Sequence, residues 1–579
     1  MYQYTDFDRS FVRQRAAQYR DQLQRNLTGR LGDDEFRPLR LQNGWYVQRH
    51  APMLRVAVPY GEISATQLRA LGRIAREFDR VDVGTPQERG GFGHFTTRQN
   101  VQFNWIALNR SADVMDALAA VDMHGIQTSG NCIRNITSDA FAGIAPDETI
   151  DPRPYCEVLR QWSTLHPEFA FLPRKFKIAV TGASEDRAAI AWHDIGLQLL
   201  KNDLGEVGFK VLVGGGMGRT PVIGSVICEF LPWQQILVFI EAIVRVYNRY
   251  GRRDNLYKAR IKILVKAEGQ KFIDAVNVEF GHIWNDDIDG TAHLIPQAEL
   301  DRVARCFELP AGVTPVTGVS AVPLDGVVAS PAYTRWLGRN VHAHRLPGYR
   351  SVTLSFKRTG QAPGDATADQ MDAAAEIAER FSHGELRVTH DQNLVLPWVR
   401  EIELPALWNA AKAQNLATPN IGLITDMIAC PGGDFCALAN ARSIPVAADI
   451  AERFTDLDEM YDIGDIDLHI SGCINSCGHH HSGHIGVLGV DKDGKEWYQI
   501  SLGGSDGSTL SGASVAGKVI GPSFAADEVA DAVEAVVETY RSRRDGAERF
   551  IDTVRRIGIN SFKDSANAVR RSTALGHSA

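Results

Sequence analysis

An internal repeat is the feature that most limits the possible folds of this 579-residue chain. Residues 65–78 and 368–381 share six identities without a gap, and apolar residues recur in both at helical spacing. A strand-like segment precedes and follows each helix, and a Gln-Asn pair lies near the second strand at 99–100 and at 392–393. Strand–helix–strand occurring twice is the outline of a ferredoxin-like half. We therefore expect an α+β fold built from a duplicated module with pseudo-twofold symmetry, the alternative being a chance likeness between two Ala-rich helices.

The first copy is longer than the second between its helix and the strand that follows. The helices lie 303 residues apart, whereas the Gln-Asn pairs lie 293 apart. We interpret residues 81–90 as an inserted loop, because Pro and Gly mark it. A fainter likeness joins residues 177–184 to residues 467–474. Each of these segments runs toward a Val/Leu strand that ends in glycine, at 210–216 and at 484–490.

Four of the eight cysteines fall within 48 residues, as a C-x5-C pair, Cys430 and Cys436, and a C-x3-C pair, Cys473 and Cys477. Two pairs of soft thiolates predict one four-sulfur metal site. Structural zinc usually has two to four residues between paired cysteines, and the first pair departs from that spacing. Pro431, directly after Cys430, is typical of iron–sulfur ligation. We expect a [4Fe–4S] cluster, with structural zinc and unrelated buried thiols as the alternatives.

Several cations stand beside strand-like or glycine-marked sequence. They are Arg55, Arg98, Arg134, Lys175 and Lys177. Each alone could be a solvated surface charge. Lys175 and Lys177, however, share one face of a strand, and two ammonium groups without a nearby acid favour a bound anion. The formal net charge of −8 argues against general nucleic-acid binding, so an anion site here must be formed by local cations.

A glycine turn follows the strand at 210–213, in the sequence KVLVGGGMGR. It lacks the G-x-G-x-x-G spacing and the downstream acid of a dinucleotide site. Further along, His479, His480 and His481 are adjacent in sequence. Consecutive side chains point in different directions, so we do not expect one metal site from all three and predict contacts with solvent or with the edge of a cofactor.

The C-x5-C and later G-C-x3-C pattern resembles the signature of the sirohaem-dependent sulfite and nitrite reductase family, and most closely the haemoprotein subunit of assimilatory sulfite reductase. The resemblance covers nearly the whole chain, because that family is also built from a duplicated ferredoxin-like and cluster-domain pair. It implies two cofactors, sirohaem and a [4Fe–4S] cluster. It also implies that Cys430, Cys436, Cys473 and Cys477 bind the cluster, and that Cys477 bridges it to the sirohaem iron.

The same resemblance implies roles for the cations and the glycine turn. Arg55, Arg134, Lys175 and Lys177 match the catalytic positions that bind the substrate anion. The positions that correspond to cofactor contacts are Arg98, Gln102, Gly214, Gly215, Gly216, Asn475 and Cys477. The 81–90 insertion has no counterpart in the family, and His94 stands where some members carry an arginine.

The reaction that the resemblance implies is the six-electron reduction of sulfite to sulfide, in assimilatory sulfur metabolism. Lys177 favours sulfite, because plant-type nitrite reductases tend to carry Asn there; reduction of nitrite to ammonia is the alternative. A non-catalytic iron–sulfur electron carrier and a zinc-stabilised binding module are candidates from other classes.

We find no flavin or NADPH site, so ferredoxin or a flavoprotein reductase must supply electrons. Neither an apolar run that could span a membrane nor an apolar signal core is present, and we expect a cytoplasmic protein.

The predicted organisation has six parts. They are an N-terminal wrapping segment (1–48), a first ferredoxin-like half (49–125), a first sirohaem and substrate domain (126–285), a connector (286–343), a second ferredoxin-like half (344–402) and a [4Fe–4S]/sirohaem domain (403–579).

Overall fold

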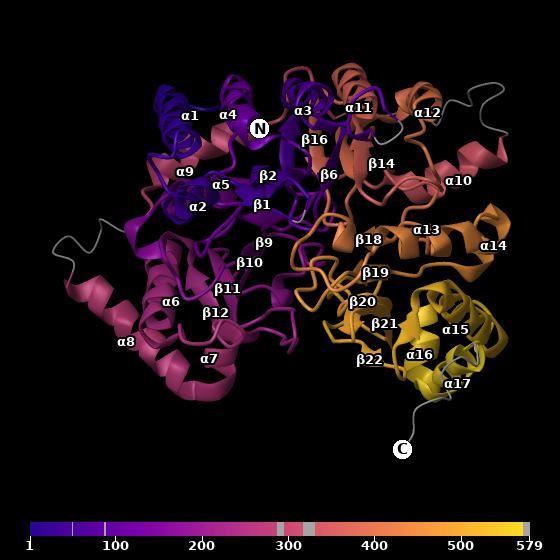
Figure 1. Cartoon of the computed structure of the whole chain (residues 1–579). Helices are drawn as coiled ribbons and strands as arrows, with labels where there is room; N and C mark the ends of the chain where they lie inside the picture. The colour runs from indigo at the N-terminus through magenta and orange to yellow at the C-terminus, as the bar shows by residue number, and fades with distance from the viewer. Residues whose placement is uncertain (49, 86–87, 287–293, 316–329, 571–579) are drawn as a thin grey trace.

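The computed structural model describes residues 1–579 except 49, 86–87, 287–293, 316–329 and 571–579 (Figure 1). The expected α+β architecture is confirmed: two upper sheets carry the ferredoxin-like halves, and two lower sheets carry the remaining domains. Within the described ranges, no helix combines the length and apolarity needed to cross a membrane.

The two upper sheets exchange one strand each. The first has the order β1-β2-β7-β6-β15, and the second has the order β13-β14-β17-β16-β3. Strand β15 comes from the second copy and pairs with β6, whereas β3 comes from the first copy and pairs with β16. The bounds are β1 Trp45–Val47, β2 Pro52–Val56, β3 Glu62–Ser64, β6 Phe92–Phe95, β7 Val101–Phe103, β13 Val341–His342, β14 Tyr349–Leu354, β15 Asp365–Thr367, β16 Glu385–Val388 and β17 Leu394–Arg400. Each half therefore needs the other to complete its sheet.

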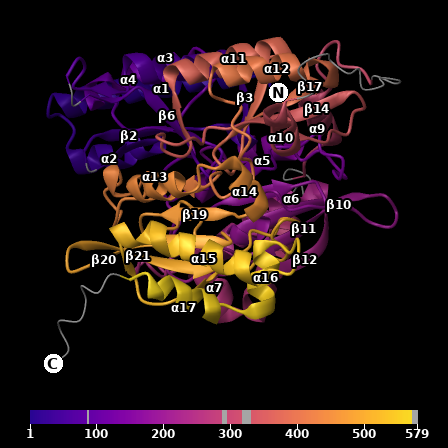
Figure 2. The same ribbon diagram turned by 90° about the vertical axis from the view of Figure 1, so that its right-hand side faces the viewer.

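The repeated helices, α3 (Ala65–Glu77) and α11 (Ala368–Phe381), lie side by side above these sheets (Figures 1 and 2). Both begin with the same capping box. The N-cap hydroxyl, of Ser64 or Thr367, accepts a hydrogen bond from the backbone N–H of a glutamine, whose side chain bonds back to the N-cap. The repeated sequence thus fixes the same helix start twice.

The Gln-Asn pairs make matching contacts across the pseudo-twofold axis. Gln99 and Gln392 are buried and both adopt positive φ, 55° and 62°. Gln99 Nε2 donates to the Val388 carbonyl at 3.0 Å, and Gln392 Nε2 donates to the Phe95 carbonyl at 2.9 Å. Each glutamine therefore binds the backbone of the other copy, which supports the duplication independently of the helices.

The two lower sheets share one topology. In the order β8-β9-β10-β11-β12 the first three strands are parallel and the rest antiparallel, and β18-β19-β20-β21-β22 repeats this pattern, with β23 also pairing with β21. The bounds are β8 Thr137–Ser138, β9 Ile178–Thr181, β10 Ile195–Lys201, β11 Val207–Val213, β12 Ser225–Pro232, β18 Ile428–Ala429, β19 Leu468–Ser471, β20 Ile485–Lys492, β21 Lys495–Leu502, β22 Lys518–Val519 and β23 Phe524–Ala525.

The proposed match of residues 210–216 with 484–490 is wrong by one strand. β20 follows β19 in parallel, so it takes the place of β10 rather than of β11. The corresponding glycines are Gly196 and Gly486. A Cβ on Gly196 would lie 2.4 Å from the Ile190 carbonyl oxygen, and one on Gly486 would lie 1.9 Å from that of His480. Both positions admit only glycine, because the preceding loop crosses there.

The N-terminal segment packs on the first upper sheet: Tyr19, in helix α1, stacks on Trp45 of β1. The 81–90 insertion contains a short antiparallel pair, β4 (Arg80–Val81) and β5 (Arg89–Gly90). Part of the connector, 287–293 and 316–329, falls outside the described residues, and the domain boundaries stay a prediction. The other helices are α1 Asp6–Leu27, α2 Asp33–Gln42, α4 Ser111–Ala119, α5 Arg153–Ser163, α6 Ile236–Tyr250, α7 Ile261–Glu268, α8 Gln270–Asp286, α9 Gln297–Ala304, α10 Pro331–Asn340, α12 Leu404–Ala413, α13 Ile444–Arg453, α14 Leu457–Ile463, α15 Val529–Arg543, α16 Phe550–Ile557 and α17 Asn560–Ala568.

Candidate cofactor and anion site

The clustered cysteines gather at one edge of the second lower sheet. Cys430 directly follows β18, and Cys473 lies two residues beyond the end of β19. These strands are adjacent and parallel, so their carboxyl ends carry both residues to the same place. Cys436 lies on the loop after Cys430, and Cys477 lies on the loop after Cys473. Topology therefore brings two cysteine pairs, some forty residues apart, to one site.

Small residues and backbone donors surround these sulfurs. The Gly472 N–H donates to Cys430 Sγ at 3.2 Å, and Asn475 Nδ2 lies 3.6 Å from Cys473 Sγ. Gly472 must be glycine, because an added Cβ would lie 2.6 Å from the Ala441 carbonyl oxygen. Donors of this kind stabilise the negative charge of a ligated thiolate.

The electrostatics of the four thiols fit a metal cluster. Burial raises the pKa of Cys430 to about 12 and that of Cys473 to about 11, and neighbouring thiolates add to both. Deprotonated thiols are needed as ligands, so bound cations must supply the compensating charge. All eight cysteines are free, and among the described residues no three His, Cys, Asp or Glu side chains could ligate a single metal ion.

Opposite the thiols, the first half presents a group of cations. It consists of Arg55, Arg98, Arg134, Arg174, Lys175, Lys177, Arg260 and Lys262. Burial and the neighbouring cations lower the pKa of Lys177 well below its usual value and that of Lys175 to about 8. Asp194 pairs with Arg260 at 2.7 Å. So many cations beside one carboxylate form a site suited to a polyanion.

Arg55 and Arg134 already make defined contacts in this group. Arg55 donates to Gln102 Oε1 at 2.9 Å, and its Nε is buried without a partner. Arg134 donates to the Thr128 carbonyl at 2.8 Å and twice to that of Gly130. The arginines are thus fixed by the protein before any anion binds.

Two predicted cofactor contacts also have partners within the protein. Arg98 donates to Thr137 Oγ1 at 2.7 Å and to the Asn135 carbonyl at 2.8 Å. Gln102 accepts from Arg55 and donates to Asn104 Oδ1 at 3.1 Å. Their contact with a cofactor stays a prediction, and Gln102 has an observed role in orienting Arg55.

The glycine turn is held from behind by cations of the same group. Lys262 Nζ donates to the Gly216 carbonyl at 3.2 Å, and a Cβ on Gly216 would lie 2.9 Å from the Arg260 guanidinium. At Gly215 an added Cβ would lie 2.3 Å from a carbonyl oxygen, and Gly214 has φ 86°. These glycines are required by the protein's own packing, whatever lies on their open side.

Cys477 joins the thiol group to the cation group. Its carbonyl accepts a hydrogen bond from Thr97 Oγ1, in the first half, at 2.8 Å. Its thiolate charge acts on the pKa of Cys430 and Cys436 on one side, and on that of Lys175 and Lys177 on the other. The residue is exposed. Its charge therefore acts on both groups, and its role as a bridging ligand stays a prediction.

The corresponding place in the second half has the opposite charge. Counting from the equivalent Gln99 and Gln392, Arg98 corresponds to Asp391; counting from Gly182 and Gly472, Lys177 corresponds to Asp467. A cavity of about 270 Å³, lined by both aspartates, lies there. Burial and three neighbouring carboxylates, Asp426, Asp467 and Asp506, raise the pKa of Asp391 to about 7. The second cavity is thus unsuited to an anion.

The histidine run is largely enclosed. His479 and His480 are buried, so neither makes the solvent contact that was one of the two expectations; contact with the edge of a cofactor stays a prediction. His480 Nδ1 bonds to Ser476 Oγ at 3.1 Å, and His481 Nε2 bonds to the Gly218 carbonyl at 2.9 Å. The run holds the Cys477 loop against the glycine turn of the first half. His94, also buried, pairs with Asp365 across the exchanged strands.

Sequence reasoning missed several members of the cation group. Arg260 and Lys262 alternate around Ile261, which is the signal that identified Lys175 and Lys177. Tyr46 was also missed: its ring lies 5.6 Å from the Arg55 guanidinium. No local pattern marks Tyr46, because only the fold brings it to the site.

Comparison with known proteins agrees with this arrangement. Residues 46–121 and 352–414 match the nitrite/sulfite reductase ferredoxin-like half domain, and residues 129–283 and 423–571 match the nitrite and sulphite reductase 4Fe-4S domain. The structure of the Mycobacterium tuberculosis NirA protein superposes with a TM-score of 0.72 at 24% identity, covering 93% of this chain and 92% of that one, and shows the same fold.

Curated relatives are similar over most of their length. A "Sulfite reductase [ferredoxin] 1" of Mycolicibacterium paratuberculosis is 25% identical, over 86% of this chain and 81% of its own. An "Assimilatory ferredoxin-dependent nitrite reductase" of Haloferax mediterranei is 26% identical, over 86% and 80%. The relatives thus include both sulfite and nitrite reductases. Since the matched domains account for most of its length, the chain belongs to the nitrite and sulfite reductase family.

Proposed function

We propose that this chain is a sulfite reductase that carries sulfite to sulfide by a six-electron reduction. Members of its family bind sirohaem and a [4Fe–4S] cluster, which supply the substrate-binding iron and the electrons. The observation that carries the proposal is that the loop of Cys477, one of the four clustered cysteines, is bonded at 2.8 Å to Thr97 of the half that carries the paired lysines.

The proposed ligands and pocket residues divide the work. Cys430, Cys436, Cys473 and Cys477 would hold the cluster, and Cys477 would also face the sirohaem iron. The cation group would hold the sirohaem carboxylates through Arg98 and its neighbours, since guanidinium groups bind carboxylates in a bidentate manner.

The anion pocket would consist of Arg55, Arg134, Lys175 and Lys177. These cations would neutralise the substrate dianion and polarise its oxygens, and the lysine ammonium groups would donate protons as S–O bonds break. A depressed lysine pKa suits this task, because proton donors work best when their pKa lies near the operating pH.

Sulfite is preferred to nitrite because two lysines side by side suit a dianion better than a monoanion. Turnover should be measured with reduced viologen on sulfite and nitrite in parallel, after iron content and the visible spectrum have shown that both cofactors are loaded. We expect the higher kcat/KM with sulfite. In Lys177→Asn we expect sulfite turnover to fall more than nitrite turnover. A wild-type preference for nitrite would overturn the choice of substrate, and loaded protein active on neither would overturn the catalytic proposal.

We propose ferredoxin as the electron donor, because relatives that reduce sulfite and relatives that reduce nitrite are both named for it. Reduced ferredoxin should support turnover at rates comparable to the viologen dye. Turnover with an NADPH-dependent flavoprotein but not with ferredoxin would contradict this choice.

A further inference from the structure

One threonine lies between the two arginines of the proposed anion pocket. The Thr128 carbonyl accepts hydrogen bonds from Arg134 Nη1 at 2.8 Å and from the Tyr46 hydroxyl at 3.2 Å. The Thr128 hydroxyl lies 2.9 Å from the Arg55 carbonyl oxygen and 2.6 Å from that of Gly125. Having one proton, it donates to one of these oxygens at a time. Thr128 thus contacts the backbone of one arginine and the side chain of the other.

Tyr46 also contacts both Arg55 and the Thr128 carbonyl. It lies on β1 beside β2, the strand that carries Arg55, and its ring lies under the Arg55 guanidinium. Its hydroxyl reaches the same Thr128 carbonyl that Arg134 uses. Tyr46 and Thr128 together therefore span the gap between the two arginines.

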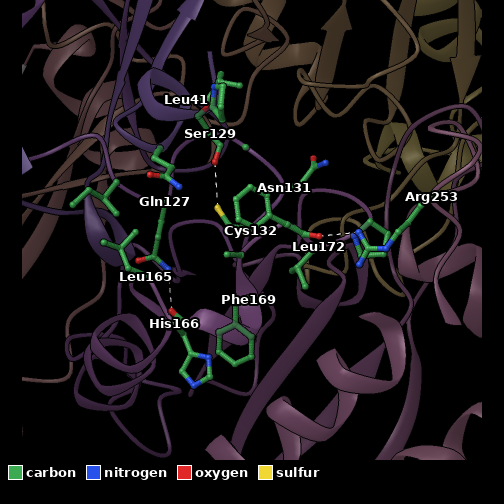
Figure 3. A pocket seen from close by; sticks show the side chains of 18 of the residues that line it. Leu41, Gln127, Ser129, Asn131, Cys132, Leu165, His166, Phe169, Leu172 and Arg253 are labelled. Carbon is green, nitrogen blue, oxygen red and sulfur yellow. Dashed lines mark hydrogen bonds between the residues drawn. The ribbon is translucent and has the colours of Figure 1, made fainter. Parts of the chain in front are cut away.

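The loop that carries Thr128 borders a cavity on one side, although Gln127, Thr128 and Ser129 are themselves buried. A cavity of about 460 Å³ lies there, lined by Gln127, Ser129, Asn131 and Cys132 of the loop, among others (Figure 3). Because a cavity cannot hold a loop in place, hydrogen bonds must do so. Gln127 anchors the start of the loop, donating to Ser163 Oγ at 3.0 Å.

The contact between the Thr128 hydroxyl and the Arg55 carbonyl is fixed in position, because Gly44 packs directly against both groups. A Cβ on Gly44 would lie 2.5 Å from the Arg55 carbonyl oxygen and 2.8 Å from Thr128 Oγ1. With φ 87°, Gly44 also adopts a conformation that other residues avoid. The close contact between β2 and the 127–134 loop is therefore built into the backbone.

We propose that Thr128, with Tyr46, is a positioning residue that sets the spacing of Arg55 and Arg134 and thereby the affinity of the pocket for its oxyanion. The proposal rests on the proposed function. Neither residue need touch the substrate. Removing the hydroxyl frees the loop over its outer cavity, and an anion must then order the loop again when it binds.

The test compares Thr128→Val, which is nearly isosteric but lacks the hydroxyl, with Thr128→Ser, which keeps it. Both are made in the holoenzyme, with cofactor loading checked by the visible spectrum. Sulfite affinity is measured by calorimetry without reductant, and KM and kcat with reduced viologen. We expect Thr128→Val to weaken sulfite binding about tenfold and to raise KM by a similar factor, with kcat changed less than threefold, and Thr128→Ser to remain within about twofold of the wild type.

Equal behaviour of the valine and serine variants would overturn the proposal, as would a valine variant that loses kcat while keeping its sulfite affinity. Should Thr128→Val fail to fold, Tyr46→Phe removes the hydrogen bond that the tyrosine hydroxyl donates to the Thr128 carbonyl, and it should weaken sulfite binding by about fivefold. An unchanged affinity in Tyr46→Phe would likewise overturn the proposal. Failure of the proposed function is distinct, since it appears in the wild type as absence of sulfite turnover.

Discussion

The charge of Lys175 should control anion binding in a way that pH reveals. In Lys175→Met the ammonium group is lost, and in Lys175→Arg a cation is kept. Two unit charges about 4 Å apart at an effective dielectric constant near 20 attract by about 4 kcal/mol. Ordering a long side chain and removing water from both charges offset part of this. We expect a net loss of about 2 kcal/mol in Lys175→Met, which weakens binding about 30-fold.

The pH dependence has a definite sign. Burial and nearby cations lower the pKa of Lys175 from 10.5 to about 8, so the ammonium form is complete well below pH 8 and is lost as pH rises through that value. A bound anion favours the protonated form. Anion affinity should therefore be flat below about pH 7 and should fall by up to about tenfold per pH unit above pH 8. In Lys175→Arg this fall should become shallower, because arginine stays charged and Lys177 still loses its charge as pH rises.

Sulfate serves as the probe, because it remains a dianion across this range whereas sulfite titrates. Its inhibition constant against sulfite, measured from pH 6 to 10 at constant ionic strength, reports the affinity of the pocket. If the inhibition constant of sulfate rises with pH equally in the wild type and in Lys175→Arg, the assignment of the titration to Lys175 is refuted. An inhibition constant that is independent of pH in the wild type would refute the electrostatic account of the pocket.

Two further predictions concern the frame around the site. Asp391→Asn should raise the melting temperature at pH 8 but not at pH 4. The pKa of Asp391 is about 7 in the folded protein, above the unfolded value of 3.8. Ionisation of this carboxyl therefore opposes folding increasingly between pH 3.8 and pH 7, and fully above pH 7. Because the carboxyl faces an open cavity, we expect a gain of only about 1 kcal/mol, and equal shifts at both pH values would contradict the reasoning. Gln392→Ala removes a bond to Phe95 of the first copy and two bonds to Ala429 of its own copy, and should cost about 2–4 kcal/mol in denaturant unfolding. The exposed Gln24→Ala is its control, and similar losses in both would show that the cross-copy bonds add nothing.

Local sequence patterns predicted the elements that depend on local physics. The helices α3 and α11 were found from their apolar spacing, and their capping residues lie three positions apart in the sequence. The cysteine site was found because its four thiols form two closely spaced pairs, Cys430 with Cys436 and Cys473 with Cys477. In both cases the information lies within a few residues of the feature.

The exchange of β3 and β15 between the two upper sheets could not be predicted from the sequence, because it depends on the pairing register of distant segments. β3 and β15 are three residues long, and nothing in either shows which sheet it will join. The mismatch of residues 210–216 has the same origin: a Val-rich strand resembles every other Val-rich strand. What distinguishes β10 from β11 is its parallel pairing with β9, which is a property of the assembled sheet.

The two copies differ in the charge of their side chains rather than in their backbone. The strand topology is the same in both, and so is the positive φ of Gln99 and Gln392. At the ends of the parallel strands, however, Asp139 stands in the first copy where Cys430 stands in the second, and cations on one side of the axis correspond to aspartates on the other.

One copy could not hold both the thiols and the anion pocket, because each would require the same strand ends. A duplicated frame removes this conflict: the second copy carries the proposed sulfur ligands, the first carries the cations, and the Cys477 loop contacts the first copy through Thr97. Duplication followed by opposite charge at equivalent positions is therefore sufficient to explain why this chain has one anion site, and why that site lies beside the thiols rather than within its own repeat.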